Sequence, residues 1–497
     1  MSTDEGTFLF AGNDSENNLE WATGDGVERG PVEKTFRPYD PHQLLLMPPS
    51  LDEWLPENHL ARFVSELVDE TLDLRPVYAA YTEGRGYPPF DPRMMVKLLI
   101  YGYSTGRRSS RGIEKRCMDD VAFRYLAGGE APDYRSIARF RRRHLTALAG
   151  FFLQALGLCR KAGMVKLGDV AVDGTKLRAN ASRHKAMSYG RMVTREQELT
   201  AEVDTILAEA ERIDAEEDAR LGADNRGDAL QGELARRETR LAVIRRAKKE
   251  LEDEAREAAA RKAEAKASAD GLDEGAVEEA VTMARAKAVP ASKAQRSFTD
   301  SESRIMKTSD GSFHQCFNGQ AVVDAEHQVI VAADLGTCAA DVESLVPMLD
   351  KVVENCGSVP EHYIADAGYC SDENLGVMAE RETDAYIATG RQKHTAVADE
   401  IPVTDAVVEL TLKEQMAKKL QTDVGKKVYS RRKVIVEPVF GQMAMLQAMR
   451  NMLLRGKEAA RAEWLLLCAC HDLRKLFNFE TAHQTMRDDR RGFVEAI

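Results

Sequence analysis

Three acidic residues, far apart in the chain, are of the type that holds metal ions for phosphodiester chemistry. Asp173 ends the apolar run 170–172, Asp366 ends the run 363–365, and Glu437 follows a basic stretch at 431–433. Two strand ends and one helix can meet in a folded chain, although 193 and 71 residues separate the three acids. Carboxylate oxygens are the ligands that Mg²⁺ prefers, and a pair of Mg²⁺ ions stabilises the attacking and the leaving oxygen of a phosphodiester.

Each carboxylate taken alone also fits a simpler role, because an Asp at a strand end often caps the turn that follows it. The three together, in a compatible order of strands and helices, favour a metal site. We therefore predict that Asp173, Asp366 and Glu437 are both the catalytic residues and the metal ligands. The expected cofactor is Mg²⁺, as two ions bridged by Asp173, and Mn²⁺ can substitute for it.

Apolar patterns predict the strands and helices that would carry these acids. Antiparallel strands joined by a short turn at 325–327 come first, and alternating strands and helices follow. That order predicts an α/β fold, a ribonuclease-H-like mixed sheet with flanking helices in which the first and fourth strands pair. The predicted strands are 169–172, 320–324, 328–334, 362–365 and 384–389, and the predicted helices are 342–353 with Asp341 as N-cap, 372–380, 437–455 with Pro438 in its first turn, and 459–476.

Residues 191–289 interrupt this pattern. They are rich in Ala, Glu, Arg and Lys, contain no aromatic residue, and carry 25 acidic and 18 basic side chains. Narrow apolar stripes, at Leu199 and Val203 and again at Leu241 and Ile244, predict an antiparallel helical hairpin or coiled coil. A charged helix pair of this kind favours a solvated arm over direct DNA contact.

Composition divides the rest of the chain. Residues 1–34 are acidic, polar and Gly-rich, so we expect a disordered tail there. The region that follows is helical in pattern, and Asp91-Pro92 is typical of a helix start. The predicted domains are the tail at 1–34, an all-α DNA-binding domain at 35–163, a catalytic domain formed by 164–190 and 290–480, the coiled-coil insertion at 191–289, and a C-terminal tail at 481–497.

The 497 residues, of which 43% are hydrophobic, are enough for more than one domain with a sizeable core. The longest apolar runs, such as 465–470, are too short to span a bilayer, so we expect a cytoplasmic protein without membrane contact. The eight cysteines include no CxxC pair and so indicate neither a zinc ribbon nor a disulfide framework. The net charge of −12 lies mostly in 1–30 and 191–289, with −6 and −7, so local basic patches elsewhere remain available to phosphates.

Basic residues cluster in two places that predict contact with double-stranded DNA. The densest segment, 135–144, follows Pro132-Asp133 as a helix start would, and a further cluster lies at 107–116. A helix of this charge could enter a major groove, although a solvated charged face is the alternative. Basic residues that flank the acids would neutralise phosphates near the scissile bond. The candidates are Arg135, Arg139, Arg141, Arg142, Arg143, Lys176, Arg178, Arg432 and Lys433.

Several stretches together resemble bacterial insertion-sequence transposases of the DDE type. The resemblance covers residues from about 35 to 480 and includes the helical N-terminal region, notably 123–126 and 139–144. The matching segments of the remaining chain are VDGTKLRANAS at 172–182, TDSESRIMK at 299–307, FNGQAVVD at 317–324, IADAGY at 364–369, VEPVFGQ at 436–442 and HDLRKL at 471–476.

This resemblance implies a transposase that cleaves its element's terminal inverted repeats and transfers the freed strands into target DNA with a divalent metal. It implies assembly on DNA as a multimer, and the predicted coiled coil makes a homodimer the expected form. By matching position it implies Asp173, Asp366 and Glu437 as the metal-binding triad. It also implies Tyr429 and Arg432 as DNA contacts on the helix that carries Glu437.

One position departs from the family's pattern. Relatives place a Lys seven residues beyond the Glu, and here that position is Ala444. The departure motivates an alternative function, a catalytically weakened or inactive transposase that acts as a DNA-binding regulator. A nuclease for RNA–DNA hybrids is a third possibility, but the basic helical domain favours duplex DNA.

Overall fold

The computed structural model describes residues 50–81, 89–182, 185–221, 229–390 and 410–495. The predicted disordered tail at 1–34 lies outside these residues. None of the helices in the described part of the chain is long and apolar enough to cross a membrane.

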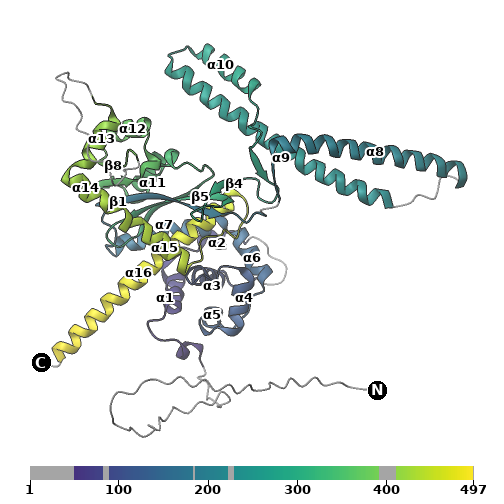
Figure 1. Cartoon of the computed structure of the whole chain (residues 1–497). Helices are drawn as coiled ribbons and strands as arrows, with labels where there is room; N and C mark the ends of the chain where they lie inside the picture. The colour runs from purple at the N-terminus through teal and green to yellow at the C-terminus, as the bar shows by residue number, and fades with distance from the viewer. Residues whose placement is uncertain (1–49, 82–88, 183–184, 222–228, 391–409, 496–497) are drawn as a thin grey trace, which may run out of the picture. The chain divides into compact units, whose positions relative to one another are not determined.

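A mixed β-sheet carries two of the three acidic residues (Figure 1). Its strands run in the order β4-β5-β1-β7-β8, and β6 pairs with the edge of β5 that faces away from β1. Strand β1 pairs antiparallel with β5 and parallel with β7, as predicted for the first and fourth core strands. The predicted ribonuclease-H-like α/β fold is therefore confirmed. The strands are β1 Asp169–Arg178, β4 Arg304–Lys307, β5 Phe313–Asp324, β6 Ile330–Gly336, β7 His362–Ala365 and β8 Ala385–Ile387.

Side chains that alternate along β1 enter two hydrophobic cores, one on each face of the sheet. Ala171 and Leu177 pack in the core with helices α15 and α16, whereas Val170 and Val172 pack in the core with α11. A shift of β1 by one residue would exchange these two sets, so the two cores together determine its register. The helices that follow the insertion are η3 Val342–Ser344, α11 Leu345–Cys356, η4 Ala367–Tyr369, α12 Asp372–Glu380, α13 Leu412–Gln421, α14 Asp423–Ser430, α15 Arg432–Leu446 and α16 Lys457–Glu495.

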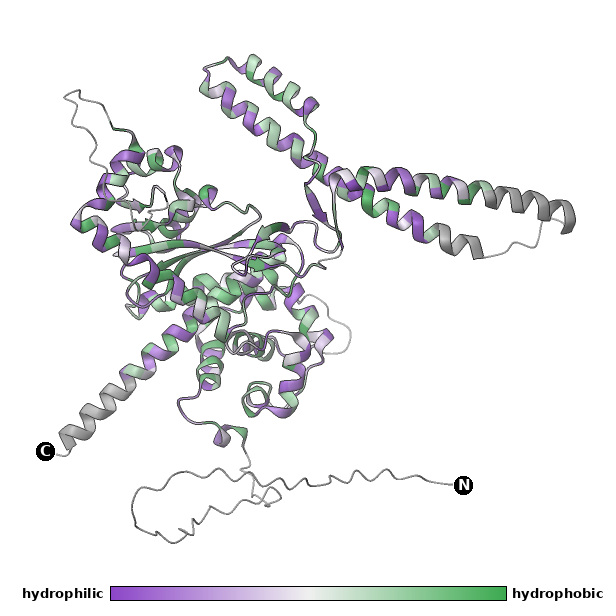
Figure 2. Ribbon diagram, in the orientation of Figure 1, coloured by the Kyte–Doolittle hydropathy of each residue, from purple (hydrophilic) through white to green (hydrophobic). Residues whose placement is uncertain are grey.

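The N-terminal helices share a core with the sheet. Asp91 caps α3 with Pro92 in its first turn, and Asp133 caps α6, as the sequence predicts. Phe151 of α7 belongs to the same buried cluster as Trp464 of α16, and Figure 2 shows hydrophobic residues concentrated where these helices meet the sheet. The helices are η1 Leu51–Trp54, α1 Leu60–Glu66, η2 Leu67–Thr71, α2 Arg75–Tyr78, α3 Pro92–Ser104, α4 Ser110–Asp119, α5 Val121–Leu126, α6 Tyr134–Arg143 and α7 Leu145–Lys161.

The insertion contains three helices. The long helix α9 packs against α8 and also against α10, so the predicted hairpin is extended by a third helix (Figure 1). Leu199, Leu241 and Ile244 of the predicted stripes are buried between α8 and α9. A two-stranded ribbon, β2 with β3, closes the base of the insertion. The elements are β2 Ala186–Ser188, α8 Tyr189–Leu221, α9 Ala229–Ala269, α10 Glu274–Lys287 and β3 Gln295–Ser297.

The helix that carries Glu437 differs in extent from the prediction. We expected a helix from 437 to 455, but α15 begins at Arg432 and ends at Leu446. The chain turns after Leu446 because Ala448 adopts a positive φ of 52°. The side chain of the buried Gln447 bonds to the carbonyl of Leu467 in α16 at 3.0 Å, so a tertiary contact stabilises the early end.

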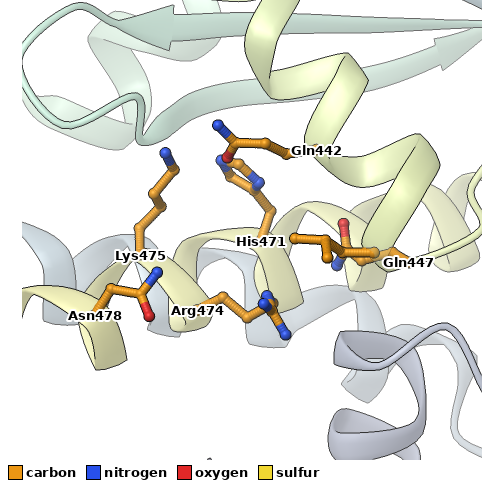
Figure 3. A pocket seen from close by; sticks show the side chains of 7 residues that line it. Gln442, Gln447, His471, Arg474, Lys475 and Asn478 are labelled. Atoms are coloured by element: carbon orange, nitrogen blue, oxygen red, sulfur yellow. The ribbon is translucent and has the colours of Figure 1, made fainter. Parts of the chain in front are cut away.

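Helix α16 contacts the β5–β6 turn through polar groups, of which His471 is buried. The Nε2 atom of His471 lies 3.0 Å from the carbonyl oxygen of Gln328, and the Lys475 ammonium donates to the Gln328 side chain at 2.9 Å. Figure 3 shows Gln442 of α15 beside His471 and Lys475. Burial lowers the pKa of His471 to about 4.

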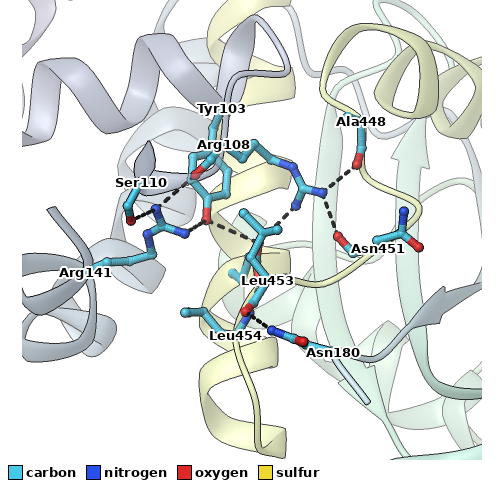
Figure 4. Close-up of polar contacts among 10 residues, drawn as sticks. Tyr103, Arg108, Ser110, Arg141, Asn180, Ala448, Asn451, Leu453 and Leu454 are labelled. Carbon is cyan, nitrogen blue, oxygen red and sulfur yellow. Dashed lines mark hydrogen bonds and ion pairs between the residues drawn. The ribbon is translucent and has the colours of Figure 1, made fainter. Parts of the chain in front are cut away.

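A buried ion pair ties the N-terminal helices to α16 (Figure 4). The Arg108 guanidinium donates to Glu463 at 2.9 Å, and the two side chains are 5% and 0% exposed. The other carboxylate oxygen of Glu463 accepts the backbone N–H groups of Leu453 and Leu454, both at 2.9 Å. Arg108 also donates to the carbonyl of Asn451 at 2.6 Å, so one buried cluster links α3–α4 to the chain between α15 and α16.

Replacing Glu463 with Ala leaves the Arg108 charge buried without its partner. We expect the free energy of unfolding to fall by about 3–5 kcal/mol. The matched control is Glu458→Ala, on the same helix but exposed, for which we expect a change of about 0.5 kcal/mol or less. Denaturant unfolding measures both, and equal losses would contradict the role of the ion pair.

Stability should decrease in mild acid because of His471. Between pH 6.5 and about 4 the unfolded chain binds a proton at this histidine while the folded chain does not. Its stabilising contribution is therefore complete above pH 6.5 and is lost as the pH falls through about 4. The loss is on the order of 3 kcal/mol. We expect His471→Gln to remove this component when unfolding free energies are compared across pH, whereas parallel profiles for the two proteins would refute it.

Candidate active site

Strands β1 and β7 bring Asp173 and Asp366 to the same region of the sheet. In their parallel pairing Ala171 lies opposite Ile364, an offset of 193 residues. Continuing this register by two residues sets Asp173 opposite Asp366. Their charges interact, because the carboxylate of Asp366 contributes to the raised pKa of Asp173. The sequence-predicted pair therefore meets.

Asp366 also caps the turn that follows it. Its Oδ1 atom accepts the backbone N–H of Gly368 at 2.8 Å. The next residue, Tyr369, is fully buried and its hydroxyl donates to the side chain of Gln320 on β5. The turn is thus anchored across the sheet, which holds Asp366 in place.

Helix α15 carries Glu437 despite an interior proline. Pro438 has no N–H to donate to the carbonyl of Val434, one turn earlier. The side chain of Gln328 supplies the missing donor, because its Nε2 atom bonds to that carbonyl at 3.0 Å. The β5–β6 turn therefore completes the helix from outside and sets its position relative to the sheet.

Arg432 lies between the predicted acids. Its guanidinium donates to Asp173 at 3.0 Å and lies 3.6 Å from the carboxylate of Glu437. The Arg432 side chain is only 12% exposed, whereas that of Glu437 is 53% exposed. Burial alone would lower the pKa of Arg432, but the Asp173 carboxylate, the Tyr429 hydroxyl and the Asp366 carboxylate outweigh it and raise that pKa. The three acids thus surround a buried cation.

Burial dominates the electrostatics of Asp173. It raises the pKa of this carboxyl to about 6, and the negative charge of Asp366 acts in the same direction. Arg432 and the backbone N–H of Gly174 partly oppose the rise, the latter through a 2.8 Å hydrogen bond. When little solvent and little positive charge surround a carboxylate, any further cation nearby stabilises its ionised form.

The sequence identified Asp341 only as a helix cap, and Asp341 does occupy the N-cap position of η3. Its side chain, however, makes no capping hydrogen bond. Instead its Oδ1 atom accepts hydrogen bonds from Asn318 at 2.6 Å, from Gln320 at 2.7 Å and from Lys176 at 3.1 Å. The amides on β5 draw the carboxylate toward the acidic site, and a pattern of local caps could not reveal contacts with a neighbouring strand.

Gly174 permits this close approach. A Cβ atom at this position would lie 2.6 Å from both Asp341 Oδ1 and Gln320 Nε2. On the turn beside it, a Cβ on Gly368 would lie 3.0 Å from Asp366 and 3.7 Å from Asp341. The two glycines therefore leave room for the Asp341 carboxylate beside Asp173 and Asp366.

The remaining predicted DNA contacts are dispersed. Lys176 faces Asp341 at the site, and Arg178, five residues beyond Asp173, pairs with Asp310 at 2.6 Å on the surface. Tyr429 does not lie on the helix of Glu437 as predicted, because α14 ends at Ser430 and α15 begins at Arg432. It is half-buried next to Arg432, and Lys433 is exposed. The four exposed arginines of α6 lie on another part of the structure: Arg135, Arg139, Arg142 and Arg143.

Arg141 differs from its neighbours on α6 because it is only 3% exposed. Its guanidinium donates to the Tyr103 hydroxyl at 3.2 Å, to the Arg108 carbonyl at 2.9 Å and to the Ser110 hydroxyl at 3.0 Å (Figure 4). These contacts hold α6 against α3 and α4.

The donor set suits a hard divalent cation. In the described residues, no three His, Cys, Asp or Glu side chains come close enough together to form a metal-binding group. The acids around Arg432 nevertheless provide only carboxylate oxygens, the ligands that Mg²⁺ takes. Asp173 and Asp366 would hold such an ion, with Glu437 reaching it from α15.

Replacing Gly174 with Ala should disturb the site without unfolding the protein. The added methyl group would force Asp341 or β1 to shift, and a displacement of about 1 Å can reduce activity by about 100-fold. The readout is the strand cleavage that the sequence predicts, together with the melting temperature. Gly168→Ala is the control, because its Cβ would meet nothing closer than 3.8 Å. Equal activity of the two variants would argue against the tight packing.

Comparisons with known proteins agree with the sequence and the fold. A transposase domain (DUF772) matches residues 49–143, which hold the N-terminal helices up to the end of α6. A transposase DDE domain matches residues 286–473, which include Asp366 and Glu437. No curated protein and no solved structure matches the chain. A helical transposase domain followed by a DDE domain on a ribonuclease-H-like sheet shows that this chain belongs to the insertion-sequence transposases of the DDE type.

Proposed function

We propose that this transposase binds the terminal inverted repeats of its own insertion sequence, cleaves the DNA at their ends and joins the freed strands to target DNA. The observation that supports this most directly is the convergence of Asp173 and Glu437 on Arg432, beside Asp366. Residues from a central strand, from the end of its neighbour and from a distant helix have no structural need to share one buried cation. A metal site for phosphodiester chemistry, by contrast, requires such residues to lie close together.

The proposed reaction has two displacements at phosphorus. In the first, a water oxygen bonds to phosphorus as the bond to the 3′-oxygen breaks, which leaves a 5′-phosphate and a 3′-hydroxyl. In the second, that 3′-hydroxyl attacks a target phosphodiester and displaces its 3′-oxygen. Divalent ions, Mg²⁺ or Mn²⁺ and expected as a pair, would activate the entering oxygen and stabilise the leaving one when bound.

The chain's own residues would position the DNA. Asp173, Asp366 and Glu437 would hold the metal, so Arg432 would become free to pair with a phosphate in place of their carboxylates. Lys176, Tyr429 and Lys433 lie close enough in sequence to these residues to contact the same strand. Asp341 would remain bonded to the amides of β5 and orient Lys176 through their 3.1 Å ion pair.

Duplex DNA is the proposed partner, as transposon end and as target. We also propose that the chain acts in the cytoplasm as a homodimer on DNA. The insertion would supply the contact between copies through the charged faces that α8 and α9 present outside their apolar seam.

Ala444 supports a second candidate, a DNA-binding regulator with weak or no catalysis. Its small side chain packs against the core on α15, where the longer chain of a Lys would extend toward solvent. No phosphate contact can therefore come from this position. Exposed cations such as Lys433 would have to supply it.

The decisive test combines excision with binding. Wild-type protein should excise a DNA segment flanked by the element's own ends in Mg²⁺, and Asp173→Ala should reduce excision by at least about 1000-fold while its affinity for those ends stays within about threefold. The control is Asp310→Ala, which removes an exposed carboxylate outside the cluster. Retained excision by Asp173→Ala would remove this residue from the chemistry. Binding without excision by the wild type would favour the regulator.

A further inference from the structure

A cleft of about 660 Å³ lies between helix α6 and the chain that leads into α16. Arg111 and Arg142 line it from the N-terminal helices, and Arg455 and Asn180 line it from the catalytic side. Leu453, with neighbouring apolar side chains, forms part of its wall. The cleft therefore joins the region matched by the helical transposase domain to the region matched by the DDE domain.

Charge sets this cleft apart from the cleft beside β7. Its described lining residues include four arginines, the three named and Arg141, and no acid. The cleft beside β7, by contrast, is lined by acidic as well as basic residues, including Asp169 and Glu361. Four guanidinium groups around one hollow repel each other unless an anion lies between them.

A buried donor without a partner lines the cleft. Arg141 is 3% exposed, its two Nη atoms are bonded to protein groups, and its Nε–H has no acceptor among the described residues. A buried unsatisfied donor costs about 1–3 kcal/mol or more. The buried guanidinium also places a fixed positive charge at the wall of the cleft.

The side chains are suited to phosphates more than to bases. Guanidinium groups bind phosphate oxygens through paired hydrogen bonds. The one aromatic lining residue, Tyr134, already has the guanidinium groups of Arg111 and Arg135 at 4.8 and 5.6 Å from its ring centre. The two cations therefore occupy its ring, which leaves little surface for a base to stack on.

Strand β1 relates the cleft to the acidic site. Five residues of extended strand separate Asp173 from Arg178, which is about 16 Å. Asn180, at the wall of the cleft, follows two residues later and accepts a hydrogen bond from Arg455 at 2.9 Å through its carbonyl. One DNA strand advances about 3.4 Å per nucleotide, so this path corresponds to roughly five to seven nucleotides.

We propose that this cleft binds the phosphodiester backbone of the transposon end, several nucleotides from the bond that is cleaved. Arg111 and Arg142 contact the phosphates from the helical side and Arg455 from the catalytic side, and the charge of Arg141 lies at the base of the cleft. This inference rests on the proposed function, because the strand that it binds is the one that the acidic site would cut.

The test measures DNA affinity without divalent metal, as a function of salt, with a labelled duplex that carries one end of the element. We expect Arg142→Gln and Arg455→Gln each to lower the slope of log affinity against log salt by about 0.9, the value for one lost phosphate contact. The matched control is Arg124→Gln, an exposed arginine of α5 that does not line the cleft, and we expect its slope to equal that of the wild type. Melting temperatures show that the variants fold.

Uncharged phosphate analogues in the DNA locate the nucleotide that the cleft contacts. A methylphosphonate at roughly five to seven nucleotides from the cleaved bond should weaken binding by the wild type but cause no further loss in Arg142→Gln. Unchanged slopes in both cleft variants, or the same drop in Arg124→Gln, would overturn the assignment. A wild-type protein that binds no DNA would instead overturn the proposed function, so the two failures are distinguishable.

Discussion

The site depends on one constraint, the position of strand β1 between an antiparallel and a parallel partner. Pairing with β5 brings the amides of Asn318 and Gln320 alongside Gly174, and pairing with β7 brings Asp366 alongside Asp173. Apolar side chains enter a separate core on each face of the sheet, so the strand cannot slip without exposing both sets. The burial that stabilises the sheet therefore also holds the acids in register.

The same burial makes Asp173 costly to ionise. Asp173 has a raised pKa because little solvent reaches it, and Arg432 compensates for only part of that effect. A buried carboxylate beside one guanidinium is a site that favours positive charge before any metal binds. Arg432 thus stabilises the folded protein and, in the proposed reaction, exchanges its carboxylate partners for a phosphate.

The N-terminal helices are part of this arrangement and not a separate attachment. They share a hydrophobic core with α15 and α16, and the buried pair of Arg108 and Glu463 lies where the two regions meet. A buried ion pair stabilises the fold only in a well-defined geometry, because each missing hydrogen bond leaves a desolvated charge without a partner. The surface that would bind DNA is therefore held at a defined distance from the acids.

Local sequence determined the elements and the chemistry: the apolar runs before Asp173 and Asp366 predicted their strands, and carboxylates near basic residues predicted a metal-dependent site for phosphodiesters. Tertiary structure alone decided the rest. It ended α15 at Leu446, directed the Asp341 side chain to the amides of β5, and buried Arg141. The physical reason is the distance along the sequence over which each feature is decided. Strand and helix patterns arise from residues a few positions apart, whereas a carboxylate chooses its partner, and a guanidinium its exposure, among groups that only the folded chain brings together.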